Sequence, residues 1–288
     1  MITSFSPKEF LESGERTIEE IISHADCSTL QAVLGIDIYR YSEYPKGAQE
    51  YIPVLFDELF RSALSSCISN EELLFQKSGL SIDHPYDFFI STGDGGFFIL
   101  DNPMLAVVFS VYFQAVVTIF NNGQSNNVLF VNLRQIIKRI DLRYSITYGD
   151  IYKYANNFYG IAIIKNARIL SKDRLNRMLI DETCMSWFSS EINSLENMQI
   201  LEPFDLRSLN FLAGYDLTKK TLLIKEKSKN NIVSVEVQRL ERLSSKNFEL
   251  EIYNCRIQVK LKYNGLSDKK YQRILITVGN LNVSGINT

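Results

Sequence analysis

Apolar residues along this chain alternate between strand-like and helix-like spacing. Leu30–Tyr39 is a nearly continuous apolar run of strand length, and 49–66 repeats apolar positions at intervals of three and four, which predicts a strand followed by an amphipathic helix. Two aromatic-rich runs, Tyr86–Ser91 and Gly96–Leu100, flank the turn Thr92–Gly95, a pattern typical of a tight hairpin. The first half is therefore expected to fold as strand, helix and hairpin.

The remaining pattern predicts further elements and a change of character near residue 198. In chain order we expect a helix at 133–139, strands at 142–148 and 151–154 around Gly149-Asp150, a helix at 160–170 and a strand at 176–181. Beyond that point short alternating segments separated by turn-prone residues indicate a small all-β unit. With a capped helix expected from Ser6 to about His24, three units are predicted, namely a helical lead-in (1–29), an α+β domain (30–190) and a β-rich domain (198–288).

The segment Met104–Phe120 is apolar enough to raise the question of a membrane span. It is at the lower limit of spanning length and carries Ser110, Gln114 and Thr118. We therefore expect a helix buried against a sheet and no membrane association.

The composition limits the kinds of functional site that are expected. The 288 residues are 45% hydrophobic and 22% charged with a formal net charge of −2, which is typical of a globular protein and argues against a nucleic-acid binder. The four cysteines are far apart and only two histidines are present, so a zinc site is not expected. A chain with free thiols and no basic, apolar leader at its start is expected to be cytoplasmic.

Two aspartates in apolar strand contexts are the leading chemical candidates. Asp37 ends the first strand and Asp94 occupies the hairpin tip. A carboxylate at the end of an apolar strand is costly to desolvate unless it is paired, and a divalent cation between two carboxylates is a common solution. Two solvated turn acids are the alternative interpretation.

Four motifs in order resemble the catalytic domain of class III nucleotidyl cyclases. They are Asp37-Ile38 with the turn Tyr39-Arg40-Tyr41-Ser42, the hairpin Thr92-Gly93-Asp94, the strand opened by Arg143, and Gly160 followed eight residues later by Arg168. The resemblance covers about Leu30 to Glu182 and implies a ferredoxin-like palm of the α+β class. It also implies two Mn²⁺ or Mg²⁺ ions per site that promote attack of the ribose 3′-hydroxyl on the α-phosphate.

The resemblance assigns a role to each matching position. Asp37, Asp94 and the carbonyl of Ile38 would bind metal, and the backbone of Tyr39, Arg40, Tyr41 and Ser42 would bind the β- and γ-phosphates. Arg40 replaces the family's usual glycine and either contacts phosphate or faces solvent. Arg143 would reach the terminal phosphates, unless it is an exposed strand arginine. Arg168 would stabilise charge on the transferring phosphate, unless it belongs to a surface salt bridge.

Three positions depart from the family pattern. Ile164 stands where most members carry the asparagine that orients the ribose, and Asn166 points to another face of the helix. The two base-selecting positions hold Ile90 and Asn157 instead of a lysine–aspartate or glutamate–cysteine pair. Without a charged selector the site suits a smaller base, which favours a pyrimidine nucleoside triphosphate, with CTP preferred to UTP because one amide matches cytosine O2 and N4.

Together with the β-rich tail, these departures most resemble the bacterial cytidylate and uridylate cyclases of antiphage defence. The resemblance implies a homodimer with composite active sites and a cyclic CMP or cyclic UMP product that acts on a downstream effector protein. Two alternatives stay open, namely an adenylyl or guanylyl cyclase with an atypical base pocket and a degenerate domain that senses nucleotides without turnover.

Overall fold

The computed structural model describes most of the chain between residues 29 and 281. The described ranges are 29–75, 78–154, 157–197, 232–240, 242–245, 248–264 and 271–281. The predicted lead-in helix, the segment 198–231 and therefore the predicted boundary between the α+β and β-rich units lie outside these residues.

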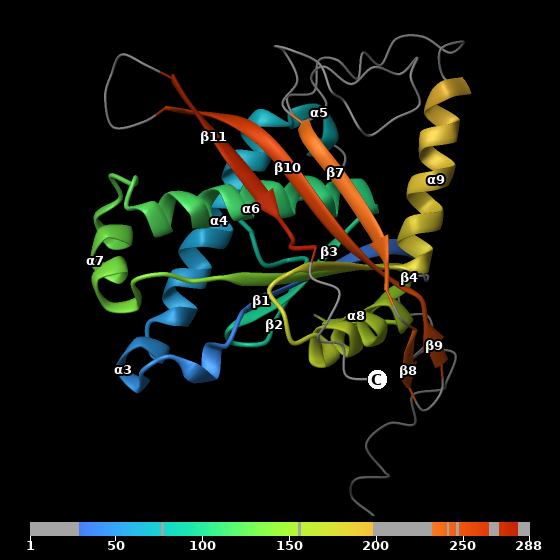
Figure 1. Ribbon diagram of the computed structural model, residues 1–288, viewed down its shortest axis with the longest axis horizontal. Coiled ribbons are helices and arrows are strands. Elements are labelled where there is room, and N and C mark those ends of the chain that lie inside the picture. Colours follow the sequence, from blue (N-terminus) through green and yellow to red (C-terminus); the bar gives the residue numbers. More distant parts are fainter. Residues whose placement is uncertain are drawn as a thin grey trace, which may run out of the picture.

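The core is a βαββαβ unit (Figure 1). Its elements are β1 (Thr29–Ile38), α4 (Ile52–Asn70), β2 (Phe89–Ser91), β3 (Gly95–Leu100), α6 (Pro103–Asn122) and β4 (Leu142–Tyr154). The strands lie side by side in the order β4-β1-β3-β2, and each neighbouring pair is antiparallel. This is the ferredoxin-like arrangement, so the predicted α+β palm is confirmed. Short helical turns, η1 (Tyr41–Glu43), α3 (Lys46–Gln49) and α5 (Glu72–Phe75), fill the connections.

One predicted break is wrong, because β4 runs through Gly149-Asp150 without a turn. Gly149 pairs with Gln31 and Asp150 with Leu30, so β1 supplies a hydrogen-bonded partner where the sequence predicted a break between two strands. The chain reverses after Tyr154 instead, and β5 (Asn157–Tyr159) pairs back on the end of β4. A glycine inside a long strand marks a close approach as often as a turn, and here Gly149 faces α8.

The second half of the α+β unit contains one unpredicted helix. The elements are α7 (Val128–Ile137), which begins five residues before the predicted helix, α8 (Ile161–Lys172), β6 (Met178–Asp181) and α9 (Glu182–Asn197). Strand β6 pairs parallel to β4. The sequence analysis missed α9.

The sheet carries helices on both faces. Figure 1 shows α6 and α4 on one face and α8 on the other. The face of α6 holds the main core, in which the even-numbered residues of β1 from Ala32 to Ile38 are buried. Helix α6 is the one helix of the described residues that is long and apolar enough to cross a membrane, and 78% of its apolar window is buried inside the protein. The expected helix buried against a sheet is thus confirmed.

The described C-terminal strands extend the same sheet. They are β7 (Ile232–Arg239), β10 (Ile252–Asn264) and β11 (Tyr271–Val278), with the small hairpin of β8 (Leu243–Ser245) and β9 (Phe248–Leu250) apart from them. Strand β10 pairs with β6, β7 and β11, and β11 packs against α6. The predicted β-rich character of this region is confirmed.

The side-chain amide of Asn166 on α8 hydrogen-bonds to both central strands, β1 and β4. Asn166 is fully buried, and its Nδ2 donates to the carbonyls of Val33 on β1 (2.7 Å) and Ser145 on β4 (3.1 Å) and to Thr147 Oγ1 (3.2 Å). Its Oδ1 accepts from the Ser145 hydroxyl. Gly35 makes this close approach possible, because a Cβ there would lie 2.1 Å from Asn166 Oδ1.

Replacing Gly35 by alanine should therefore destabilise the fold. Overpacking a tight interior contact costs about 1–3 kcal/mol, so we expect Gly35→Ala to lower the free energy of unfolding in urea by that amount. Gly47→Ala is the matched control, since a Cβ at Gly47 meets nothing within 4 Å, and its stability should be unchanged or higher by up to about 1 kcal/mol. Equal stabilities for the two variants would contradict this packing.

Candidate active site

The carboxyl end of β1 brings the two candidate acids together. Asp37 is in register with Gly95 of β3 on one side and Arg143 of β4 on the other. The next residue, Ile38, donates its backbone N–H to the carbonyl of Asp94 (3.2 Å), so the hairpin tip is held beside the end of β1. Asp37 and Asp94, separated by 57 residues in sequence, become neighbours through antiparallel pairing.

Arg143 is the direct partner of Asp37. Its Nε donates to Asp37 Oδ2, and both side chains are mostly buried, with exposures of 23% and 17%. Burial raises the pKa of Asp37, the Arg143 guanidinium opposes that rise, and the nearby Asp94 carboxylate adds to it. The site therefore places two acids close enough to repel each other, with one guanidinium to neutralise them.

The donor set suits a hard divalent cation. Two carboxylates and the Ile38 carbonyl are oxygen ligands of the kind Mg²⁺ and Mn²⁺ prefer, and Mg²⁺ is often held by one or two carboxylates with substrate phosphates completing its shell. The charge repulsion between Asp37 and Asp94 is relieved when a cation lies between them. Among the described residues no group of three or more His, Cys, Asp or Glu side chains could hold a metal ion, so phosphate oxygens would have to supply the remaining ligands.

The turn after β1 is anchored to the same region. Tyr39 donates its backbone N–H to the backbone carbonyl of Asp141 (2.9 Å) and its hydroxyl to the carbonyl of Arg174 (3.0 Å). Arg40 has φ +56°, the left-handed conformation that lets successive backbone N–H groups form an anion-binding concavity. Its guanidinium is 59% exposed and pairs with Glu43 at 3.4 Å.

Tyr41 and Ser42 complete this turn. Tyr41 is half-buried and packs against the main core, while Ser42 is exposed. Their predicted role, like that of Tyr39 and Arg40, depends on the backbone of the turn, so binding of the β- and γ-phosphates there stays a prediction.

Arg168 lies on the outer face of α8. Ile164 and Arg168, four residues apart, are both exposed, whereas Asn166 between them is buried against the sheet. The Arg168 side chain makes no hydrogen bond or ion pair with any residue the structure describes. Among the described residues no contact therefore joins it to Asp37 or Asp94, and its predicted role at the transferring phosphate stays a prediction.

The two predicted base-selecting positions lie on different surfaces. Ile90 of β2 packs against a small apolar cluster on the α8 face of the sheet, formed by Val33, Ile99, Ile151, Phe158 and Ala162. Asn157 is exposed and pairs with Tyr154. Its Oδ1 accepts from the N–H of Phe158 (2.9 Å), so this oxygen is engaged within the hairpin.

The sequence analysis missed the segment that supports Arg143. The carbonyl of Asp173, just after α8, accepts a hydrogen bond from Arg143, and the Asp173 carboxylate pairs with Arg177 at 2.9 Å in a fully buried contact. Burial raises the pKa of Asp173, and Arg177 opposes this. In the sequence, the only sign of this pair is that Asp173 and Arg177 are four residues apart just after the predicted helix. That spacing does not reveal that both side chains are buried.

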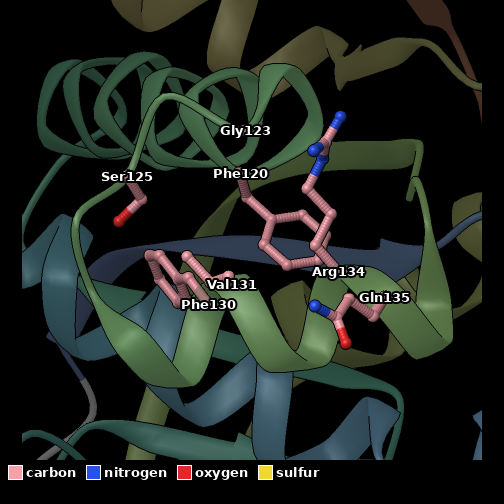
Figure 2. Close-up of a pocket in the computed structure, with 7 residues that line it drawn as sticks. All are labelled: Phe120, Gly123, Ser125, Phe130, Val131, Arg134 and Gln135. Carbon is pink, nitrogen blue, oxygen red and sulfur yellow. The ribbon is translucent and has the colours of Figure 1, made fainter.

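A hollow of about 200 Å³ lies elsewhere, between the end of α6 and α7. Figure 2 shows it lined by Phe120, Phe130 and Val131, with the Arg134 side chain reaching toward Gly123. Arg134 Nε donates to the carbonyl of Asn121 (3.2 Å). Its guanidinium thus caps a carbonyl at the end of α6. This contact accounts for an arginine at the hollow, and no bound ligand is needed to explain it.

Comparisons with known proteins find similarity in structure alone. No protein-family model matches the sequence, and no curated protein is found as a relative. Among solved structures, the guanylyl cyclase Cya2 aligns over 79% of this chain and 92% of its own length, with 11% identity and a TM-score of 0.43. The adenylate/guanylate cyclase/hydrolase of Silicibacter pomeroyi aligns over 80% and 97% (13% identity, TM-score 0.38).

The adenylyl cyclase CyaB from P. aeruginosa aligns over 80% of this chain and 95% of its own (14% identity, TM-score 0.37). All three are named as adenylyl or guanylyl cyclases, but similarity at this level does not show an activity for this chain. The assignment of function therefore rests on the residues of the site.

The contact between Asp37 and Arg143 should appear as a coupling energy. We expect Arg143→Met to destabilise the protein because it leaves a mostly buried carboxylate without its partner. In the double variant with Asp37→Asn much of that loss should be recovered. Urea unfolding of the two single variants and the double variant should give a coupling of about 1–3 kcal/mol, whereas effects that add within about 0.5 kcal/mol would show that the pair does not stabilise the fold.

Proposed function

We propose that this protein is a metal-dependent nucleotide cyclase that converts a pyrimidine nucleoside triphosphate to its 3′,5′-cyclic nucleotide and pyrophosphate. The observation that supports the reaction type is the placement of Asp37 and Asp94 side by side at the end of β1. Two carboxylates on an otherwise apolar palm suit two-metal phosphoryl chemistry.

Each residue of the site has a separate proposed role. Asp37, Asp94 and the carbonyl of Ile38 would hold two Mn²⁺ or Mg²⁺ ions, which when bound polarise the α-phosphate and lower the pKa of the attacking 3′-hydroxyl. The turn Tyr39–Ser42 would orient the β- and γ-phosphates with its backbone N–H groups. Because the pKa of Asp37 is raised, this carboxyl becomes protonated at a higher pH than an ordinary aspartate. A metal ligand must be deprotonated, so metal affinity should fall as the pH decreases through that pKa.

Arg143 would exchange partners during binding. In the structure its guanidinium neutralises Asp37, and a cation at Asp37 would release it to reach the terminal phosphates of the substrate. Arg168 would come from the second protomer of a homodimer, which accords with its exposed position on α8. Its guanidinium would stabilise the charge that develops on the transferring phosphate.

The choice of a pyrimidine rests on the apolar residue at position 90. Ile90 cannot pair with a purine edge as a lysine or glutamate does. We propose CTP as substrate in preference to UTP on the match between the Asn157 amide and cytosine, which requires Asn157, on the side of β5 opposite Phe158, to turn toward the base when the nucleotide binds. The cyclic nucleotide would serve as a second messenger for an effector protein in antiphage defence, as the family resemblance implies.

A second candidate is a domain that binds nucleotides without turning them over. It is favoured by Ile164, which is 50% exposed where the family has a ribose-orienting asparagine. Retention of both acids and of Arg168 favours the enzyme. A purine nucleotide cyclase with an atypical base pocket is the other alternative within the same chemistry.

Incubation with each nucleoside triphosphate and Mn²⁺ tests the activity. We expect cyclic CMP or cyclic UMP with an equal amount of pyrophosphate, detected by mass spectrometry, and a loss of at least about a hundredfold in rate for Asp37→Asn and Asp94→Asn because the ligand charge is removed. Asp83→Asn, which changes an exposed loop carboxylate, is the matched control and should retain activity. Cyclic AMP as the sole product would refute pyrimidine selection, and nucleotide binding without any product would favour the sensor.

Mixing two inactive variants tests the shared site. Asp37→Asn and Arg168→Ala should each be inactive, but in a mixed dimer one of the two sites contains an intact Asp37 and an intact Arg168. If subunits exchange freely in an equimolar mixture, about a quarter of wild-type activity should return. No recovery, despite mixed dimers detected by native mass spectrometry, would place Arg168 in the same site as its own Asp37.

A further inference from the structure

A lysine lies at the edge of the apolar cluster on which Ile90 packs. Lys153 of β4 pairs with Phe158 of β5, and the alternation of side chains along β4 places Lys153 on the same face of the sheet as Arg143 and Ile151. Phe158 and Ile151 belong to the apolar cluster on which Ile90 and Phe88 pack. Lys153 is therefore at the border of the surface where the base-selecting residue at position 90 lies.

The ammonium group of Lys153 is held by aromatic rings. Its Nζ lies 5.4 Å from the ring centre of Phe158 and 6.0 Å from that of Phe88, distances at which a cation is attracted to an aromatic face. The two rings are themselves 6.1 Å apart. Lys153 forms no salt bridge and no hydrogen bond with the residues described in the structure, so its three N–H donors are available to a ligand.

The residue expected to select the base from this hairpin faces the other way. Successive residues of β5 point to opposite sides of the strand. Asn157 is exposed and is the cross-strand partner of Tyr154, whereas Phe158 is buried and is the cross-strand partner of Lys153. Lys153, in contrast, lies over the Phe88 and Phe158 rings of the cluster on which Ile90 packs.

We propose that Lys153 is a specificity-determining residue that donates a hydrogen bond to a carbonyl of the pyrimidine base. Lys153 lies ten residues along β4 from Arg143, the partner of Asp37, so the base it contacts belongs to a nucleotide whose metal ions are held by the acids of the second protomer in the composite site. This inference rests on the proposed function and adds to it the residue that reads the base. Phe88, Phe158 and Ile90 form the apolar wall beside the base, and the rings restrict the motion of the lysine.

The chemistry of the four bases explains the selection. Cytosine and uracil share a carbonyl at C2, which accepts from Lys153, whereas adenine has no carbonyl. Guanine has one too, but its N1–H and amino group leave three N–H bonds without an acceptor among Ile90 and the rings, against one in uracil and two in cytosine, and its second ring needs more room. Unpaired buried donors are unfavourable, so guanine is the worst fit of the three. Lys153 therefore separates pyrimidines from purines and does not distinguish CTP from UTP.

The test compares Lys153→Met with Lys153→Arg. Methionine keeps the unbranched stem and removes the charge, so kcat/KM for CTP and UTP should fall about 10- to 100-fold, while the values for ATP and GTP should change less than about twofold. Arginine, which keeps a donor, should restore part of the loss. Lys260→Met on β10 is the matched control, because Lys260 is exposed on the C-terminal strands, and melting temperatures establish that all variants are folded.

The outcomes separate this inference from the proposed function. If Lys153→Met lowers kcat/KM equally for all four nucleotides, or leaves the pyrimidines unchanged, Lys153 does not select the base although the protein is a cyclase. If the wild type turns over no nucleotide, the proposed function fails, and calorimetry decides the role of Lys153. Binding of CTP that is about tenfold weaker in Lys153→Met, with ATP binding unchanged, would support base reading, and equal affinities would overturn it.

Discussion

Strand β1 is paired antiparallel with β3 along one edge and with β4 along the other, and its register determines which side chains meet at its end. A shift of one residue would turn Asp37 into the main core and expose Ile36 or Ile38. The burial of Ala32, Leu34, Ile36 and Ile38 against α4 and α6 prevents that shift. Packing on one face of β1 thus fixes the position of Asp37 on the other face. As a consequence Asp37 lies beside Gly95 on β3 and Arg143 on β4.

Support for the acids continues outward through polar contacts. Arg143 joins Asp37 to the carbonyl of Asp173, and the buried pair of Asp173 and Arg177 holds that segment in place. Asn166 joins α8 to both central strands. Buried polar groups of this kind are stable when every partner is present, and they keep the helix that carries Arg168 fixed relative to the strands that carry Asp37 and Arg143.

The palm could be predicted from sequence because its strongest elements have clear periodicity. The apolar run ending at Asp37, the glycine-flanked hairpin and the apolar helix α6 formed as expected, since burial and turn chemistry agree at each of them. Gly149-Asp150 was misread because local turn propensity gave way to pairing with β1. The partners of Arg143 and the position of Lys153 depend on residues far apart in sequence, and no local pattern encodes which face of a hairpin a side chain shares with another strand.

The proposed chemistry requires Asp37 and Asp94 to form one metal centre. Electron paramagnetic resonance can count the Mn²⁺ ions bound per protomer in the presence of a CTP analogue with a methylene group between the α- and β-phosphates. We predict about two ions for the wild type, fewer for Asp37→Asn and for Asp94→Asn, and an unchanged number for Asp83→Asn. The same number of bound ions in the wild type and in both active-site variants would show that Asp37 and Asp94 do not form a metal centre.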